Sequence, residues 1–422
     1  MTDRATRTRT HLDDMLEATR LTSMGRLDES TALIQRSLFG LGARPDQSGP
    51  APHAASPAAT IAPPAGAGAA DGMAAAQAAL SPEGLRAAVG SVVRGLGRGV
   101  APVVAPVLKG LEGWAGGVPR APEPEPRGEA GGPGGAFVDG QFTCAAGTRD
   151  YKLFIPSHPQ ARAPLVVMLH GCTQSPDDFA AGTGMNPLAE REGIYVVYPG
   201  QSRLANGQKC WNWFEPRDQG REGGETAIIA GLTRALIAEH GLDSGRVYIA
   251  GMSAGGAAAA NIARAYPDLF AAVGVHSGLA AGCARDVSSA LMAMQVGAPG
   301  STDPSGFGAP ITGKRVPTIV FHGDEDGTVS VRNADQILAQ AGTDGLAASR
   351  ERFEDAGHPF TRTRYRDDEG RVLVEDWRVR GAGHAWSGGD PRGSYTDGRG
   401  PNASRAMLDF FAQHSLKPRR AA

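Results

Sequence analysis

The sequence predicts an α/β fold in which a mostly parallel sheet is covered by helices on both faces. Short, β-branched apolar runs alternate with longer runs of helical periodicity, and the apolar runs are continuous, as in strands buried on both faces. Of the 13 Phe, 7 Tyr and 5 Trp, only Phe39 and Trp114 lie before Phe137. Because a core requires large apolar side chains, we expect the folded domain to begin near residue 137.

The spacing of apolar residues predicts the elements of this domain in order. Buried strands are predicted at Leu165–Leu169, Ile194–Tyr198, Val247–Ala250, Ala272–Val275, Thr318–Phe321 and Val372–Val379. Helices are predicted between or after them, at Ala227–Glu239, Ala254–Ala265, Asn333–Ala341 and Arg405–His414. Strands that alternate with helices in this way are typical of parallel sheets with crossover connections.

Composition divides the 422-residue chain into four parts. These are a predicted helical hairpin (residues 1–43), a flexible linker rich in Ala, Gly and Pro (44–136), the α/β domain (137–417) and a tail (418–422). Within the linker, Leu85–Trp114 has Val and Leu at three- and four-residue steps with Arg between them. A cationic amphipathic segment that lies on a membrane or a hydrophobic granule is therefore the alternative there.

Charge and hydropathy exclude several classes of protein. A net charge of −2 and an isoelectric point of about 6.6 argue against a nucleic-acid binder that depends on phosphate neutralisation. No apolar run approaches the length of a transmembrane helix. The N-terminal residues lack the apolar stretch of a secretory signal peptide, which favours a cytoplasmic or granule-associated location. The four cysteines have no CxxC spacing, so we expect no metal site from them.

The strongest motif is the G-x-S-x-G formed by Gly251, Ser253 and Gly255, directly after a predicted strand and directly before a predicted helix. A serine on such a sharp turn requires glycine two positions before it and two positions after it, where a Cβ atom would clash with the backbone. The motif predicts that Ser253 is the nucleophile of a hydrolase, and the alternative is a glycine-rich structural turn.

A serine nucleophile requires a general base and an acid that orients the base, in the chain order Ser, acid, His. We expect His384, in a glycine-rich loop after the last strand, to be the base, and His358 is the alternative. The strand that ends at Phe321 is followed by three acidic residues, among which composition does not choose: Asp324, Glu325 and Asp326. Their spacing does not match a calcium-binding loop, and we expect no metal there.

The oxyanion hole requires two backbone N–H groups. We expect one from Ala254 and the other from Cys172, with Thr173 as an alternative to Cys172, and we give the neighbouring His170 no acid–base role. Cys172 and Cys210 form either a disulfide or two free thiols. We expect Trp211, Trp213 and Trp386 to contact substrate by lining an apolar acyl pocket, and core packing is the alternative for the first two.

The chain from about residue 138 to 416 resembles the polyhydroxybutyrate depolymerase family of esterases, which are α/β-hydrolases. The motifs that carry the resemblance are Leu169-His-Gly-Cys-Thr-Gln174, Cys210-Trp-Asn-Trp-Phe214, Gly251-Met-Ser-Ala-Gly-Gly256, His322-Gly-Asp-Glu-Asp-Gly-Thr-Val329 and Gly383-His-Ala-Trp386. The resemblance implies that Asp326 is the acid of the triad. It also supports Ser253 as the nucleophile and His384 as the base.

The resemblance implies hydrolysis of poly(3-hydroxybutyrate) or its oligomers, without a cofactor. Feruloyl and acetylxylan esterases are related, so a carbohydrate esterase is the alternative, and a catalytically silent granule-binding protein is a third hypothesis. Secreted members carry a signal peptide and a polymer-binding domain, and neither is recognisable here. We therefore expect action on amorphous granules or soluble oligomers inside the cell, with an extracellular enzyme as the family-based alternative.

Overall fold

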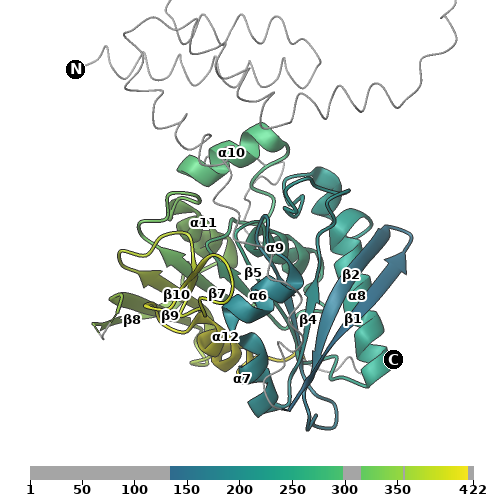
Figure 1. Ribbon diagram of the computed structural model, residues 1–422. Helices are drawn as coiled ribbons and strands as arrows, with labels where there is room; N and C mark the ends of the chain where they lie inside the picture. Colours follow the sequence, from purple (N-terminus) through teal and green to yellow (C-terminus); the bar gives the residue numbers. More distant parts are fainter. Residues whose placement is uncertain (1–133, 298–314, 355–356, 417–422) are drawn as a thin grey trace, which may run out of the picture. The chain divides into compact units, whose positions relative to one another are not determined.

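The computed structural model describes residues 134–297, 315–354 and 357–416. A ten-stranded sheet has the order β1-β2-β4-β3-β5-β6-β7-β10-β9-β8, and a small sheet pairs β11 with β12 (Figure 1). The strands are β1 (Ala136–Cys144), β2 (Gly147–Ile155), β3 (Leu165–Leu169), β4 (Tyr195–Pro199), β5 (Val247–Met252), β6 (Ala272–His276), β7 (Thr318–Gly323), β8 (Ala347–Phe353), β9 (Phe360–Arg366), β10 (Val372–Val379), β11 (Trp386–Ser387) and β12 (Thr396–Asp397).

The centre of the large sheet is parallel. The strands from β4 through β3, β5, β6 and β7 to β10 pair in parallel, whereas β1 and β2 at one edge and β9 and β8 at the other pair antiparallel. Parallel strands end at the same edge of a sheet, so the loops that follow β3, β5, β7 and β10 gather there. This edge carries the residues that the sequence selects as functional.

Helices cover both faces of the sheet, as the sequence predicts. They are α6 (Pro176–Thr183), α7 (Met185–Glu192), α8 (Gly224–His240), α9 (Ala254–Ala265), α10 (Val287–Val296), α11 (Arg332–Ala341) and α12 (Ala403–Phe411), together with the short 3₁₀ helix η1 (Pro216–Asp218). Alternate residues of β3 pack into two separate cores. Leu165 and Val167 face the core built with α8, α9 and α11, whereas Val166 and Met168 face the one built with α6, α7 and α12.

The predicted buried strands and helices are confirmed, with ends that differ by a few residues. The folded domain was expected to begin near residue 137, and β1 begins at Ala136. The predicted hairpin of residues 1–43, the linker of 44–136 and the tail of 418–422 fall outside the described residues, except for the last three linker positions. Within the described part of the chain, no helix combines the length and the hydropathy required to cross a membrane.

A row of stacked aromatic rings crosses five strands of the sheet. His276 of β6 is the register partner of Phe321 of β7, which is in turn the partner of Trp377 of β10. Phe360 of β9 stacks on Trp377 at 5.3 Å, and Phe353 of β8 stacks on Phe360 at 4.6 Å between ring centroids. Cross-strand ring pairs of this kind stabilise neighbouring strands and fix their register.

Replacing Phe411 by alanine is expected to lower the free energy of unfolding by about 3–5 kcal/mol, because the change opens a cavity in the core. The Phe411 ring is fully buried on α12 and stacks on Tyr248 of β5 with centroids 4.9 Å apart. Urea denaturation monitored by circular dichroism measures the effect. The matched control is Leu204→Ala, since Leu204 is 100% exposed and its loss is expected to change stability by less than about 0.5 kcal/mol.

Candidate active site

Ser253 lies on a sharp turn between β5 and α9, with a positive φ of 56° and a ψ of −122°. A Cβ atom on Gly255 would lie 2.5 Å from the carbonyl oxygen of His170, and one on Gly251 would lie 2.8 Å from that of Leu169. Real Cβ atoms do not approach backbone oxygens so closely, so both positions require glycine. The turn presents the serine at the carboxyl edge of the sheet, as the motif predicts.

Asp326 and His384 form a hydrogen-bonded pair. Asp326 follows β7, and its Oδ2 accepts a hydrogen bond of 2.8 Å from Nδ1 of His384, in the loop after β10. The other carboxylate oxygen accepts the backbone N–H groups of Thr328 and Val329 at 2.9 and 2.8 Å. Burial raises the pKa of Asp326, but the hydrogen bond and charge of His384 outweigh it and hold the pKa below the ordinary value. The carboxylate therefore stays ionised at neutral pH.

The other two acidic residues of the turn are exposed, whereas Asp326 is buried. The carboxylate of Asp324 accepts the backbone N–H of Gly381 at 2.6 Å, and the backbone N–H of Glu325 donates to the Ala382 carbonyl at 3.1 Å. Both contacts hold the loop that carries His384. Geometry thus distinguishes Asp326 from its neighbours, a choice that composition left open.

His358 is engaged outside this pair. Its Nε2 lies 2.8 Å from a carboxylate oxygen of Asp397, and its Nδ1 lies 3.0 Å from the carbonyl oxygen of Arg380. In the described part of the chain, no hydrogen bond joins the side chains of Ser253 and His384. Catalytic hydrogen bonds are often long in the absence of substrate. The complete triad therefore remains a prediction, built on the observed Asp326–His384 pair and the position of Ser253.

The loop after β3 lies against the serine. A Cβ atom on Gly171 would be 3.6 Å from Cβ of Ser253. The N–H of Thr173 donates to the carbonyl of Gln208 at 2.7 Å and is therefore occupied. The N–H of Cys172 has no acceptor among the described residues, which favours Cys172 over Thr173 as an oxyanion donor beside Ala254.

A disulfide joins Cys172 to Cys210 and so connects the loop after β3, the predicted oxyanion loop, to the segment that follows β4. His170 strengthens the same connection, because its Nε2 accepts the backbone N–H of Gln201 at 3.0 Å. Its Nδ1–H then donates to the Gly171 carbonyl at 2.7 Å. Burial lowers the pKa of His170 to about 4, so the ring is neutral and structural.

Sequence reasoning missed Glu225, a buried carboxylate at the start of α8. It accepts hydrogen bonds from the backbone N–H of Asn212 at 2.7 Å, from Arg149 at 3.1 Å and from the side-chain amide of Gln201. Burial, and then the charge of Asp218, raise the pKa of Glu225. These bonds hold the segment that contains Cys210. No local motif marks Glu225, because its partners lie up to 76 positions away in the sequence.

The three tryptophans expected to contact substrate are buried, which favours core packing over contact with substrate. Trp211, Trp213 and Trp386 are 0%, 5% and 1% exposed and belong to the two cores. The indole N–H of Trp211 donates to the His170 carbonyl at 3.0 Å, and that of Trp386 donates to Ser404 at 3.1 Å. Burial of a large indole with a hydrogen-bond partner for its N–H is more stabilising than its exposure to solvent. These rings therefore pack in the cores beneath the loops that carry the predicted site residues.

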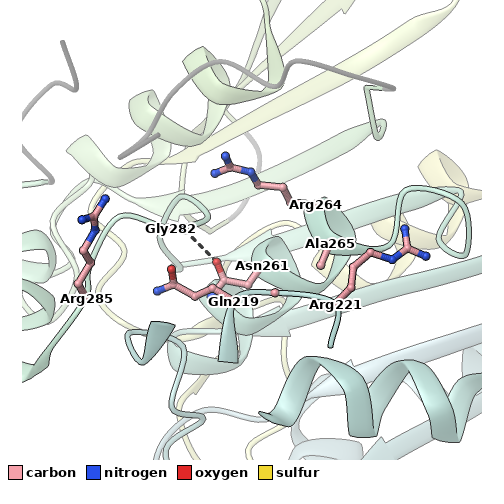
Figure 2. A pocket seen from close by; sticks show the side chains of 8 residues that line it. Gln219, Arg221, Asn261, Arg264, Ala265, Gly282 and Arg285 are labelled. Carbon is pink, nitrogen blue, oxygen red and sulfur yellow. Dashed lines mark hydrogen bonds between the residues drawn. The ribbon is translucent and has the colours of Figure 1, made fainter. Parts of the chain in front are cut away.

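A cavity of about 330 Å³ lies beside α9 (Figure 2), away from the predicted catalytic residues. Its walls are polar and basic, and they include Gln219, Arg221, Asn261, Arg264, Gly282 and Arg285. Arg221 pairs with Asp268 through two hydrogen bonds of 2.8 and 3.0 Å. A basic cavity of this kind does not suit an apolar acyl chain, and the predicted acyl pocket is not this cavity.

Comparison with known proteins agrees with this geometry. Residues 149–348, which include Ser253 and Asp326, match the family model described as Esterase PHB depolymerase. A feruloyl esterase B from Thermothelomyces thermophilus is 30% identical over 203 residues, which are 44% of this chain and 67% of that protein. The chain belongs to the Esterase PHB depolymerase family.

Within this family, poly(3-hydroxyalkanoate) depolymerase C from Paucimonas lemoignei is 34% identical to the chain over 238 residues. The match covers 54% of this chain and 56% of that depolymerase. Among solved structures, an acetyl xylan esterase from Aspergillus awamori aligns with a TM-score of 0.51 and 22% identity, over 63% of this chain and 94% of that one. This structural similarity, together with the parallel sheet, confirms the predicted α/β-hydrolase fold.

Replacing Gly255 by alanine is expected to reduce esterase activity to near background, because the new methyl group would overlap the backbone that carries the oxyanion loop. Hydrolysis of a soluble p-nitrophenyl ester measures the loss. Gly327→Ala is the matched control, since a Cβ at Gly327 meets nothing within 4 Å. Full activity in Gly255→Ala would contradict the close packing described for the turn.

Proposed function

We propose that the protein is a serine esterase that uses Ser253, His384 and Asp326. In the first step, Oγ of Ser253 attacks the ester carbonyl while Nε2 of His384 takes its proton. Asp326 keeps the proton of His384 on Nδ1 and stabilises the imidazolium that forms. The N–H groups of Cys172 and Ala254 stabilise the negative oxygen of the tetrahedral intermediate.

Acylation ends when His384 gives this proton to the leaving alcohol, and the acyl group remains on Ser253. In the second half, His384 takes a proton from a water molecule as the water attacks the acyl-enzyme. His384 then returns the proton to Oγ of Ser253 as the bond to the acyl group breaks and the acid is released. Each step involves the same three side chains and the same two N–H groups, so the proposal requires no cofactor.

The observation that carries the proposal is the 2.8 Å hydrogen bond from His384 to a buried, ionised Asp326 at the sheet edge where Ser253 lies. An acid that is buried and receives two further backbone N–H groups is rigid. Rigidity of this pair is what a general base needs if its free nitrogen is to meet the serine hydroxyl.

For the substrate, we propose the ester bonds of poly(3-hydroxybutyrate) or its oligomers. Support comes from the family and from the relative named poly(3-hydroxyalkanoate) depolymerase C. Because the chain spans only about half of that relative, the polymer does not follow from the match itself. A carbohydrate ester of ferulic or acetic acid is the second candidate, which the feruloyl esterase and the acetyl xylan esterase favour.

The location of the enzyme is likewise a proposal. The Cys172–Cys210 disulfide favours the extracellular alternative. Disulfides persist in oxidising compartments and are rare in the cytosol. We therefore propose that the enzyme works in an oxidising compartment, where the Cys172–Cys210 disulfide persists. Such a location supports extracellular polymer or oligomers as the substrate.

Replacing Ser253 by alanine is expected to lower hydrolysis by on the order of a millionfold, because the nucleophile is lost. The decisive measurement is release of 3-hydroxybutyrate from amorphous granules, run beside methyl ferulate with wild-type enzyme and Ser253→Ala. Release from granules alone supports the polyester. Release of ferulate without release from granules would keep the proposed triad and favour a carbohydrate ester as the substrate. Hydrolysis that survives in Ser253→Ala would refute the mechanism.

Association with granules is a separate proposal, which rests on the cationic apolar composition of Leu85–Trp114. Removal of residues 1–135 is expected to weaken binding to granules while hydrolysis of a soluble ester is kept. Sedimentation of granules with bound protein measures the first quantity. Binding that is undiminished after the deletion would contradict a tether in this part of the chain.

A further inference from the structure

His276 contacts two of the three segments that supply the predicted triad and takes no part in the chemistry described above. It is the last residue of β6, between β5 and β7 in the sheet, and its side chain is 2% exposed. The carbonyl oxygen of His276 accepts the backbone N–H of Ser253 at 2.9 Å. Its backbone therefore holds the turn that presents the nucleophile.

The side chain of His276 reaches the loop that carries the general base. Its Nε2 accepts the backbone N–H of Ser387 at 3.0 Å, three residues after His384. Its ring stacks on Trp386 with centroids 4.9 Å apart and on Phe321 with centroids 5.7 Å apart. One side chain thus contacts the loop of His384 and the strand that leads to Asp326.

The hydrogen bonds define the protonation of this ring. Because Nε2 accepts an N–H, it carries no proton, and the proton lies on Nδ1, 3.3 Å from Oγ of Ser277. Burial, and then the nearby His322 and His384, lower the pKa of His276 to about 3. The ring is therefore neutral at neutral pH, and the acceptor at Nε2 is always available.

The His384 loop is held from two sides. Before His384, Asp324 and Glu325 of the acid turn bind Gly381 and Ala382. After His384, the Trp386 N–H donates to the Tyr395 carbonyl at 2.7 Å, and the next N–H, that of Ser387, donates to His276. The first set of contacts connects the loop to the acid, whereas the contact with His276 connects it to the nucleophile turn.

We propose that His276 is a positioning residue that sets the distance between the His384 imidazole and Ser253 through its Nε2 acceptor. This inference rests on the proposed function, since it requires that His384 act on Ser253. Loss of the acceptor would leave a buried N–H unpaired and let the loop shift. A shift of about 1 Å in a catalytic group can lower the rate on the order of a hundredfold.

Three variants separate the acceptor from the ring. His276→Gln places its amide oxygen as many bonds from Cβ as Nε2 and keeps the acceptor, whereas His276→Asn is one methylene shorter and loses it. His276→Phe keeps a ring in the stack without any acceptor. All three retain the backbone bond to Ser253. Tyr198→Phe is the control, because it removes a buried hydrogen bond of 2.7 Å from Tyr198 on β4 to Asn186 on α7, outside this site.

The experiment measures kcat and KM of the full-length chain on a soluble p-nitrophenyl ester, together with thermal unfolding. We expect kcat to fall on the order of a hundredfold in the Asn and Phe variants with KM nearly unchanged, and to recover to within a few-fold of wild type in the Gln variant. Tyr198→Phe should lose stability and keep its kcat.

Equal kcat in the Gln and Asn variants, or full activity in the Phe variant, would overturn the proposal. If the Gln and Asn variants unfold, the kcat of the Phe variant tests the proposal alone, because this variant preserves the packed ring. The Ser253→Ala variant distinguishes failure of the proposed triad from failure of the proposed role of His276. An active Ser253→Ala enzyme refutes the triad itself, whereas an inactive one combined with a fully active His276→Phe enzyme refutes only the role of His276.

Discussion

The site depends on one steric constraint, the close approach of the Gly255 backbone to the end of β3. A Cβ atom at position 255 would lie 2.1 Å from the carbonyl oxygen of Leu169, so only glycine allows α9 to begin at Ala254, directly after Ser253 with its positive φ. The loop after β3 also lies against the serine, since a Cβ atom on Gly171 would be 3.6 Å from Cβ of Ser253. The proposed nucleophile and the proposed oxyanion donors therefore depend on a single packing contact, between the start of α9 and the end of β3.

The proposed acid and base depend on a second set of contacts. They lie on loops after β7 and β10, which are neighbours in the sheet, and these loops bind each other through Asp324 and Glu325. The Asp326–His384 pair is thus assembled locally, independent of Ser253. The position of this pair relative to Ser253 depends on β6, which lies between β5 and β7 in the sheet. The proposed positioning residue, His276, therefore lies on β6.

The sequence predicted the central strands because they are buried on both faces and read as continuous apolar runs. It did not predict β1, β2, β8 and β9, because edge strands alternate or carry charge, and β9 has arginine at every second position from Arg362 to Arg366. Ser253 was recognisable since its requirements are local. The burial of Trp211, the selection of Asp326 by geometry and the contacts of Glu225 depend on residues distant in sequence, which no single motif contains.

The row of stacked rings has an optical consequence. It begins with Phe353 at the sheet edge, passes through Trp377, and ends with Trp386, two residues after His384. Stacked chromophores held rigidly in an asymmetric environment couple their electronic transitions and give near-ultraviolet circular dichroism. A displacement of the loop that carries His384, the proposed general base, would therefore change the near-ultraviolet circular dichroism of the protein even without substrate.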